Sequence, residues 1–317
     1  MSLTTQLFRW WLDLPFIGLK YKKSAYRHLS RRGENRDIPF VSDFFGLRYE
    51  GNLQNGIEFA IYYYGAFEKP LLFFLRDTAR VLTSNGEEQL CFCDIGSNVG
   101  QHALFMSQHA NEIHAFEPYQ LVRDRLSHHK KINNLANITV HPVGLGASNA
   151  ELNFFAPTGS NQGIGSFISR EEEDIDPRLT DIGKLKVCQA DGYFMDHQIP
   201  LPKLVKIDVE GFERSVLQGM KTLLSDKRPV LVCEVTYGEQ QSFSSLAELQ
   251  QALPENYALY HFDIRKPNGQ TDRRRGSRAK RSGAFSVVPM DCWRESGQDD
   301  IVAIPRELVG KIPLSKP

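Results

Sequence analysis

Short apolar runs alternate with amphipathic segments over most of the 317-residue chain. Such runs are typical of strands in a parallel sheet that is covered on both faces, and the segments between them have the spacing of helices. The predicted strands are 90–95, 113–116, 138–141, 204–207, 229–235 and 257–262, with candidates for a last strand at 284–288 and 300–304. This alternation predicts an α/β fold with a doubly wound, mostly parallel sheet.

The residues ahead of this alternation predict a small N-terminal cap at 37–89. The stretch 44–52 has the pattern of a strand and a turn, and 57–61 is a second strand candidate. Residues 68–81 carry apolar side chains at helical spacing, and Pro70 falls in the first turn, where proline is tolerated. We therefore expect two strands and a helix in the cap.

The main domain is expected to cover 90–305, followed by a tail at 306–317. Within it, residues 150–190 interrupt the strand and helix pattern with an exposed strand at 151–155 and an acidic, polar stretch at 170–184. This departure predicts a small β insertion with a mobile loop, which can serve as a substrate lid.

The first 36 residues concentrate aromatic and aliphatic side chains between Leu7 and Leu19, and lysines and arginines follow up to Arg32. An aromatic patch followed by basic residues is typical of a segment at a membrane surface. The pattern also fits packing on the main domain or at a dimer contact, with the basic residues on a solvated face. The aromatic and basic segment 1–36 therefore has two interpretations, and the membrane contact would involve residues 7–32.

Composition narrows the class of protein. Lys plus Arg and Asp plus Glu both number 38, so no net charge draws the whole chain to nucleic acid or membrane. No run of 18 apolar residues and no secretory signal is present, so we expect a cytoplasmic protein, with peripheral contact at the inner membrane face as the alternative. Five cysteines without a C-x-x-C pair predict buried free thiols.

The most informative stretch is 94–100, which follows the first strand of the main domain. A strand, a glycine loop and a helix form the nucleotide-binding corner of an α/β sheet. Asn98 stands where a dinucleotide binder has its middle glycine, and Asp94 would repel a pyrophosphate. Glu117 ends the next strand, 21 residues after Gly96, where a carboxylate accepts ribose hydroxyls. The two acidic strand ends favour S-adenosylmethionine, a cationic nucleoside without phosphate.

Acidic residues end four of the predicted strands, namely Asp94, Glu117, Asp208 and Glu234, and Glu210 lies just beyond one of them. Ligands of such sheets bind outside the carboxyl ends of the strands, so these side chains should gather on one rim. Because like charges repel, a cluster of this kind does not serve stability. The pattern predicts a functional site.

Several stretches together resemble the FkbM methyltransferase family, and the resemblance covers roughly residues 57–262. They are Asp-Ile-Gly-Ser-Asn-Val-Gly at 94–100, Ala-Phe-Glu-Pro at 115–118, Lys-Ile-Asp-Val-Glu-Gly-Phe-Glu at 206–213, and Arg228-Pro229 with Glu234, together with Glu68 and Asp191. The resemblance implies a class I methyltransferase (Rossmann-like) fold with a seven-stranded sheet of order 3-2-1-4-5-7-6. It also implies S-adenosylmethionine as donor and O-methylation of hydroxyls, often on sugars or glycosylated products.

The expected site residues divide into a donor side and an acceptor side. The cofactor-binding residues are expected to be Asp94, Gly96, Ser97, Asn98, Gly100, Glu117, Pro118, Gly144 and Asp208. Glu68, Tyr64 and Glu234 are expected to bind the acceptor.

A sugar hydroxyl is a poor nucleophile while protonated, so a general base is expected. We expect Asp208 or Glu210 to accept the proton and Lys206 or His261 to orient it, because Lys206 alternates with Asp208 and faces the same side of its strand. Asp208, Glu210 and Glu234 are also hard oxygen ligands for a divalent ion, but no histidine or asparagine is visibly placed with them, and we expect no metal.

The basic stretch Arg273–Arg281, in a predicted loop at 265–283, keeps a nucleic-acid methyltransferase open as the alternative enzyme. The stretch lacks stacking aromatics, and 208–211 lacks the Asn/Asp-Pro-Pro-aromatic turn typical of base methyltransferases. A solvated loop, or a site for an acidic glycan, phosphate or lipid head group, explains the arginines as well. A non-catalytic membrane-surface protein on a methyltransferase scaffold and a nicotinamide oxidoreductase are the remaining alternatives, and cofactor binding separates them.

Overall fold

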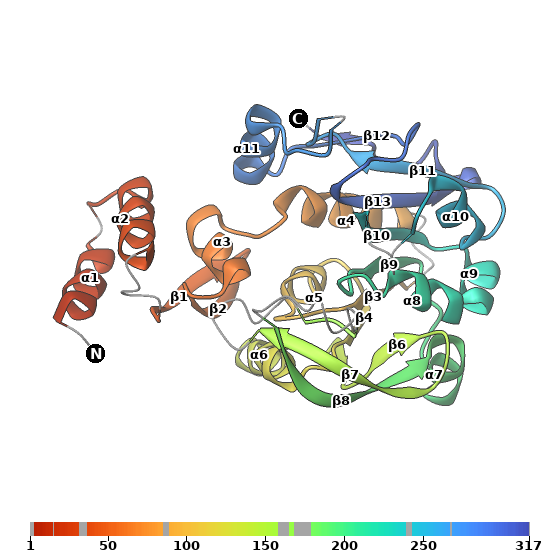
Figure 1. Ribbon diagram of the computed structural model, residues 1–317, viewed down its shortest axis with the longest axis horizontal. Helices are drawn as coiled ribbons and strands as arrows, with labels where there is room; N and C mark the ends of the chain where they lie inside the picture. Colours follow the sequence, from red (N-terminus) through yellow and green to blue (C-terminus); the bar gives the residue numbers. More distant parts are fainter. Residues whose placement is uncertain are drawn as a thin grey trace.

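A large twisted sheet forms the centre of the molecule, and helices cover both of its faces (Figure 1). The computed structural model describes residues 3–14, 16–31, 37–84, 89–157, 165–167, 179–238, 243–266 and 268–316. Within these ranges the central sheet has nine strands. In spatial order they are β14 (Ser315–Lys316), β12 (Phe285–Pro289), β11 (Tyr257–Phe262), β13 (Gly297–Pro305), β10 (Val230–Tyr237), β9 (Leu204–Ile207), β3 (Cys91–Ile95), β4 (Glu112–Phe116) and β5 (Ile138–His141).

The strand order is that of a class I methyltransferase-like sheet. Strands β5, β4, β3, β9 and β10 run parallel, and β13 lies antiparallel between β10 and β11. Read from β5 to β11, this is the order 3-2-1-4-5-7-6, with β13 as the seventh strand. The described sheet differs from the expected seven strands because β12 and β14 pair antiparallel beyond β11.

Alternate residues of the central strands enter two separate cores, as a doubly wound sheet requires. Phe92 of β3 belongs to the core beneath α4 (Lys69–Leu82), α5 (Gln101–Met106) and α6 (Gln120–Ile132). Its neighbours Cys91 and Cys93 belong to the core beneath α7 (Ala190–Asp196), α8 (Glu213–Gly219), α9 (Lys221–Lys227) and α10 (Leu246–Gln251). Both faces of β3 are therefore buried, which explains why its sequence is apolar throughout.

The cap contains an antiparallel strand pair and a helix. β1 (Pro39–Phe44) pairs with β2 (Leu47–Asn52), but the strand predicted at 57–61 is wrong, because α3 (Gly56–Tyr64) occupies these residues. The side-chain oxygen of Asn55 accepts hydrogen bonds from the backbone N–H groups of Ile57 and Glu58, at 2.9 and 3.2 Å. This N-cap stabilises a helix, although the isoleucine, phenylalanine and tyrosine residues of the segment favour a strand.

Replacing Asn55 by alanine is expected to lower the free energy of unfolding by about 1 kcal/mol, because it removes the N-cap of α3. Urea unfolding measures the change. Asn55→Asp keeps a side-chain acceptor and is expected to retain most of the stability. An equal loss in both variants would contradict the capping role.

The expected β insertion is a three-stranded sheet of β6 (Gly144–Gly146), β8 (Leu179–Gln189) and β7 (Ala150–Pro157). The loop predicted after β5 contains the short strand β6, which pairs with β8. Of the acidic stretch 170–184, residues 179–184 belong to β8. The rest lies outside the described residues, and the predicted lid stays a prediction.

The N-terminal segment forms two helices, α1 (Leu3–Asp13) and α2 (Leu19–Arg31). Phe8 and Leu12 of α1 pack with Tyr26 of α2 in a small core that also includes Ile38 and Tyr63 of the cap. The two helices therefore pack on the cap, which lies between them and the main sheet (Figure 1). None of the helices in the described ranges has the length and apolar composition that crossing a bilayer requires.

The basic stretch predicted as a loop at 265–283 contains a helix, α11 (Arg273–Ser282). Asp272 caps it, because its side chain accepts hydrogen bonds from the backbone N–H groups of Arg274 and Arg275, both at 2.9 Å. Gly283 ends the helix with φ +75°. The capping aspartate and the terminal glycine are the sequence signals of this helix, although the run of arginines between them suggests a solvated loop.

Candidate active site

A cavity of about 470 Å³ opens beyond the carboxyl ends of β3, β4 and β9, where ligands of such sheets bind. Nine of the predicted site residues line it. They are Glu68, Gly96, Asn98, Glu117, Pro118, Gly144, Asp208, Glu210 and Glu234. The strand ends therefore do bring most of the predicted acids to one cavity.

The glycine turn after β3 forms the donor side of this cavity. Gly96 has φ +80°, and a Cβ atom added there would lie 1.7 Å from the backbone oxygen of Asp208. The turn and the end of β9 can approach each other only because residue 96 has no side chain. Gly100 has φ +82°, and its Cβ would overlap Leu126 of α6, so it serves helix packing as its position suggested.

Glu117 lies at the end of β4, opposite the glycine turn. Its two carboxylate oxygens accept hydrogen bonds from the backbone N–H groups of Asn98 and Tyr119, both at 2.9 Å. Burial raises the pKa of Glu117 to about 7, although these hydrogen bonds act in the opposite direction. Each carboxylate oxygen keeps a further acceptor position, so Glu117 can accept hydroxyl donors from a ligand in the cavity.

Asp94 and Lys206 lie beneath the cavity and do not line it. Asp94 is fully buried and accepts a hydrogen bond from the backbone N–H of Ala103 in α5, at 3.1 Å. The Lys206 ammonium lies 3.6 Å from Asp94 and 3.1 Å from Asp208. Burial opposes the charge of Lys206, but Asp208 and Asp94 together raise its pKa above the usual lysine range. Lys206 therefore stays protonated and holds the Asp208 carboxylate at the cavity floor.

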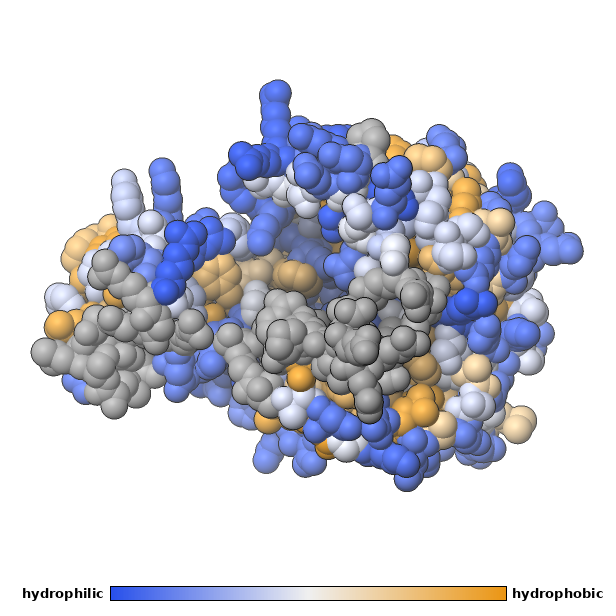
Figure 2. All heavy atoms as spheres, viewed as in Figure 1, coloured by the Kyte–Doolittle hydropathy of each residue, from blue (hydrophilic) through white to orange (hydrophobic). Residues whose placement is uncertain are grey.

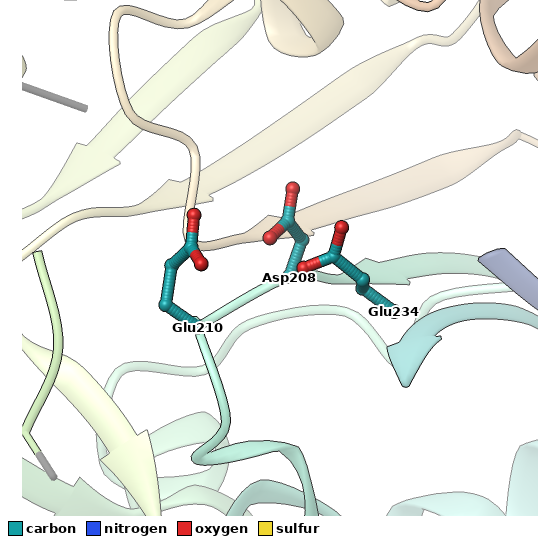
Figure 3. Close-up of side chains that lie close together, drawn as sticks. All are labelled: Asp208, Glu210 and Glu234. Carbon is teal, nitrogen blue, oxygen red and sulfur yellow. The ribbon is translucent and has the colours of Figure 1, made fainter. Parts of the chain in front are cut away.

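Three of the carboxylates that line the cavity lie close together (Figure 3). Asp208, Glu210 and Glu234 each place an oxygen within 4.8 Å of the others. Burial, then the neighbouring carboxylates of Asp208 and Glu210, raise the pKa of Glu234 well above its usual range. Burial, then Asp300 and Asp208, raise the pKa of Glu68 in the same way. Both shifts have the same physical cause, because several carboxylates share one buried region.

The backbone around Glu210 is held in an uncommon conformation. Glu210 has φ +53° and Gly211 has φ +98°. One oxygen of the buried Glu213 carboxylate accepts hydrogen bonds from the N–H groups of Val209 and Gly211, both at 3.0 Å. The hydroxyl of Ser166 donates to the Glu210 carbonyl at 2.8 Å. This bracing positions the Glu210 side chain toward the other two acids.

Comparison with known proteins identifies the family of the chain that forms this cavity. A family model described as the methyltransferase FkbM domain matches residues 94–262, a range that holds the glycine turn, Glu117, Asp208, Glu210 and Glu234. The chain belongs to the FkbM methyltransferase family.

Relatives of this FkbM methyltransferase include the hexuronic acid methyltransferase AglP of Haloferax volcanii, which is 32% identical over 160 residues. The match covers 50% of this chain and 61% of that protein. Among solved structures, an FkbM methyltransferase from Methylobacillus flagellatus is 15% identical and covers 71% of this chain and 47% of that one, with a TM-score of 0.38. An SAM-dependent methyltransferase from Agrobacterium tumefaciens is 8% identical and covers 84% and 70%, with a TM-score of 0.43.

Some predicted residues of this FkbM methyltransferase lie away from the cavity wall, including Asp94, Lys206, Gly100 and Ser97. His261 lies on β11, where its Nδ1 is 3.3 Å from the Arg294 guanidinium and 3.2 Å from the Phe262 carbonyl. Tyr64 lies at the end of α3, where its hydroxyl is 3.2 Å from the Lys23 ammonium. The structure does not bring His261 or Tyr64 to the other site residues.

Other lining residues of the FkbM methyltransferase escaped sequence reasoning. Asp300 on β13 is the register partner of Glu234, and burial beside Asp208 raises its pKa to about 7. Because β13 is antiparallel, its beginning lies at the edge where the parallel strands end. The pair Asp299-Asp300 at the start of a strand was therefore the available signal. Aromatic side chains complete the wall, contributed by Phe154, Phe167 and Phe212.

Proposed function

We propose that this FkbM methyltransferase uses S-adenosylmethionine to methylate a hydroxyl oxygen of a sugar or glycosylated product. The observation that carries the proposal is one cavity with two chemically different sides. A glycine turn and the buried Glu117 carboxylate form one part of its lining, and three neighbouring carboxylates form another. A donor with a sulfonium and an ammonium fits an acidic cavity better than a pyrophosphate does.

On the donor side, the Gly96 turn leaves room for the nucleoside, and Glu117 is proposed to accept its ribose hydroxyls. Bound S-adenosylmethionine supplies a methyl carbon that is already activated by its sulfonium. Asn98, Pro118 and Gly144 line the same side and are proposed to contact the nucleoside. The chain's task is to align an acceptor oxygen with that carbon, which supplies several kcal/mol of rate enhancement, up to about 7–11.

On the acceptor side, Asp208 or Glu210 is proposed to accept the hydroxyl proton. Lys206 orients Asp208 through their 3.1 Å contact, while Glu68 and Glu234 are proposed to hold further hydroxyls of the acceptor. A sugar carboxylate would face several acids here, whereas a neutral hydroxyl can donate to them. The cavity therefore favours a neutral sugar hydroxyl as the reacting group. The hexuronic acid methyltransferase among the relatives supports a sugar-based acceptor.

The test is a binding and transfer experiment with the full chain. Calorimetry is expected to detect S-adenosylmethionine and its demethylated product but not NAD. Transfer of a labelled methyl group is then assayed on neutral sugars, glycosylated products and nucleic acid. Label on a sugar oxygen supports the proposal. Binding of NAD alone, or label only on nucleic acid, would contradict it.

S-adenosylmethionine is expected to bind more tightly as pH rises through about 7. Burial raises the pKa of Glu117 to about 7, so below that pH the free protein holds a neutral carboxyl. A ribose that donates to the carboxylate stabilises the ionised form, so affinity rises with pH and then levels off. Glu117→Gln cannot ionise and is expected to lose this dependence and about ten- to a hundredfold in affinity.

Calorimetric titrations at a series of pH values measure the effect. Glu255→Gln, an exposed glutamate after α10, is the matched control and is expected to bind as the unmodified protein does. If Glu117→Gln kept both the affinity and the pH dependence, another group would hold the ribose.

A further inference from the structure

Large apolar side chains are exposed in one part of the molecule far more than elsewhere. Five of the ten that are exposed among the described residues lie between positions 7 and 21. We call them the apolar patch: Leu7, Trp10, Phe16, Leu19 and Tyr21. Trp10 of α1 is 65% exposed and Phe16, after the helix, is 80% exposed, whereas Phe8 and Leu12 of α1 are buried against the cap. Helix α1 therefore has one apolar side packed inward and a second apolar side without a described partner.

Two helices of the same side of the molecule, α2 and α11, expose basic side chains (Figure 1). Helix α2 exposes Lys20, Arg27 and Arg31, and no acidic residue occurs between positions 14 and 31. Helix α11 exposes a second group, and it also contains no acid. This group consists of Arg273, Arg274, Arg278, Lys280 and Arg281, besides Arg275, which pairs with Asp263 and Asp272. The other four arginines form no ion pair with a described carboxylate.

The two basic helices, more than 200 residues apart in sequence, each place one lysine at the ring of Tyr64. The Lys23 ammonium of α2 lies 4.8 Å from the centre of the Tyr64 ring, and the Lys280 ammonium of α11 lies 4.4 Å from it. Figure 2 shows hydrophilic side chains over both helices, on either side of a hollow.

We propose that α1, α2 and α11 form a docking surface for an anionic lipid bilayer, with the apolar patch inserted at the interface and the basic side chains on the head groups. Stable attachment takes both signals, an inserted apolar group and a basic cluster. The chain as a whole carries no net charge, so these cations are a local concentration. The charge of the surface therefore complements an anionic membrane.

Other occupants match the surface less well. A second copy bound through a twofold axis would place the basic residues of α2 and α11 against the same residues of the other copy, and these like charges would repel. A water-soluble polyanion would match the arginines and leave Trp10 and Phe16 in water. An anionic bilayer accounts for both the apolar and the basic side chains.

The experiment is co-sedimentation of the full chain with vesicles of phosphatidylcholine, with and without phosphatidylglycerol. Binding is expected only to the anionic vesicles and is expected to weaken as salt is added. Two double variants test the two parts of the surface. Trp10→Ser with Phe16→Ser is expected to abolish retention, and Arg274→Gln with Arg278→Gln is expected to weaken it about five-fold for each cation removed.

Matched controls use exposed residues elsewhere. Met195→Ser with Leu201→Ser, and Lys131→Gln with Lys221→Gln, are expected to bind as the unmodified protein does. Unchanged thermal midpoints and S-adenosylmethionine affinity establish that the variants fold. No anionic-vesicle binding, equal binding to neutral vesicles, or equal losses in the controls would each overturn the proposal. So would tighter binding to single-stranded DNA that survives the Trp10 and Phe16 changes, or a dimer in light scattering that those changes dissociate.

Discussion

Replacing Asp208 by asparagine is expected to lower kcat by about 10²–10⁴-fold while S-adenosylmethionine still binds. Asparagine keeps the size of the side chain but cannot accept the proton of the acceptor hydroxyl. It also removes the negative charge that lies 3.1 Å from the Lys206 ammonium, so this ion pair no longer holds the side chain at position 208 in place. Because Glu117 and the glycine turn, and not the Asp208 carboxylate, are proposed to hold the nucleoside, donor binding should change far less than turnover.

Single-turnover methyl transfer and calorimetry on the same samples separate these two effects. Glu210→Gln is measured in parallel, because Asp208 and Glu210 are the two candidates for the base, and the true base should also lose the acidic limb of its pH profile. Asp226→Asn, at an exposed position of α9, is the matched control. If Asp208→Asn and Glu210→Gln both transferred methyl groups at the unmodified rate, neither carboxylate would be the base. The assay is repeated with a chelator. A carboxylate that acts as the base is expected to work without a divalent cation, whereas a cation ligand is not.

Replacing Gly96 by alanine is expected to abolish S-adenosylmethionine binding and to lower the free energy of unfolding by at least about 3 kcal/mol. The added Cβ would lie 1.7 Å from the Asp208 backbone oxygen and 2.8 Å from its carbonyl carbon. Backbone atoms cannot move aside as a flexible side chain can, so the turn and the end of β9 would separate. The same displacement would move Asp208 itself, which links donor binding to catalysis.

A second glycine isolates the steric part of this effect. Gly46, in the turn between β1 and β2, has φ +89°, and an added Cβ would meet nothing within 4 Å. Gly46→Ala carries a similar backbone penalty of about 1 kcal/mol without a clash, and it should bind S-adenosylmethionine normally. Urea unfolding and calorimetry compare the variants. Equal stability losses at the two positions would show that contact with Asp208 is unimportant.

The sequence predicted the site well where a short motif fixes the backbone. The turn at Gly96 follows a buried strand, and Glu117, Asp208 and Glu234 reach one cavity because parallel strands end at one edge. Periodicity alone cannot say how deep a side chain lies. Asp94 therefore seemed equivalent to Glu117, whereas it is buried below the cavity and bonds to Ala103 of α5.

The wrong predictions share a physical cause. A helix cap or the pairing of distant strands outweighs the residue composition of the segment itself. The segment 57–61 is rich in strand-forming residues, yet the Asn55 cap starts a helix there. The arginine run near residue 275 suggested a solvated loop, yet Asp272 caps a helix. Asp300 escaped notice because the direction of β13 depends on pairing between distant strands, which no local pattern encodes.

The reversed direction of β13 has a consequence for how this chain can diverge. The residues proposed to hold the donor lie before position 145, whereas Asp299 and Asp300 enter the cavity from a segment beyond residue 262, where the family match ends. The proposed donor contacts and this part of the cavity lining are thus encoded on separate stretches of the polypeptide. Substitutions beyond residue 262 can therefore reshape the cavity while the proposed nucleoside contacts stay unchanged.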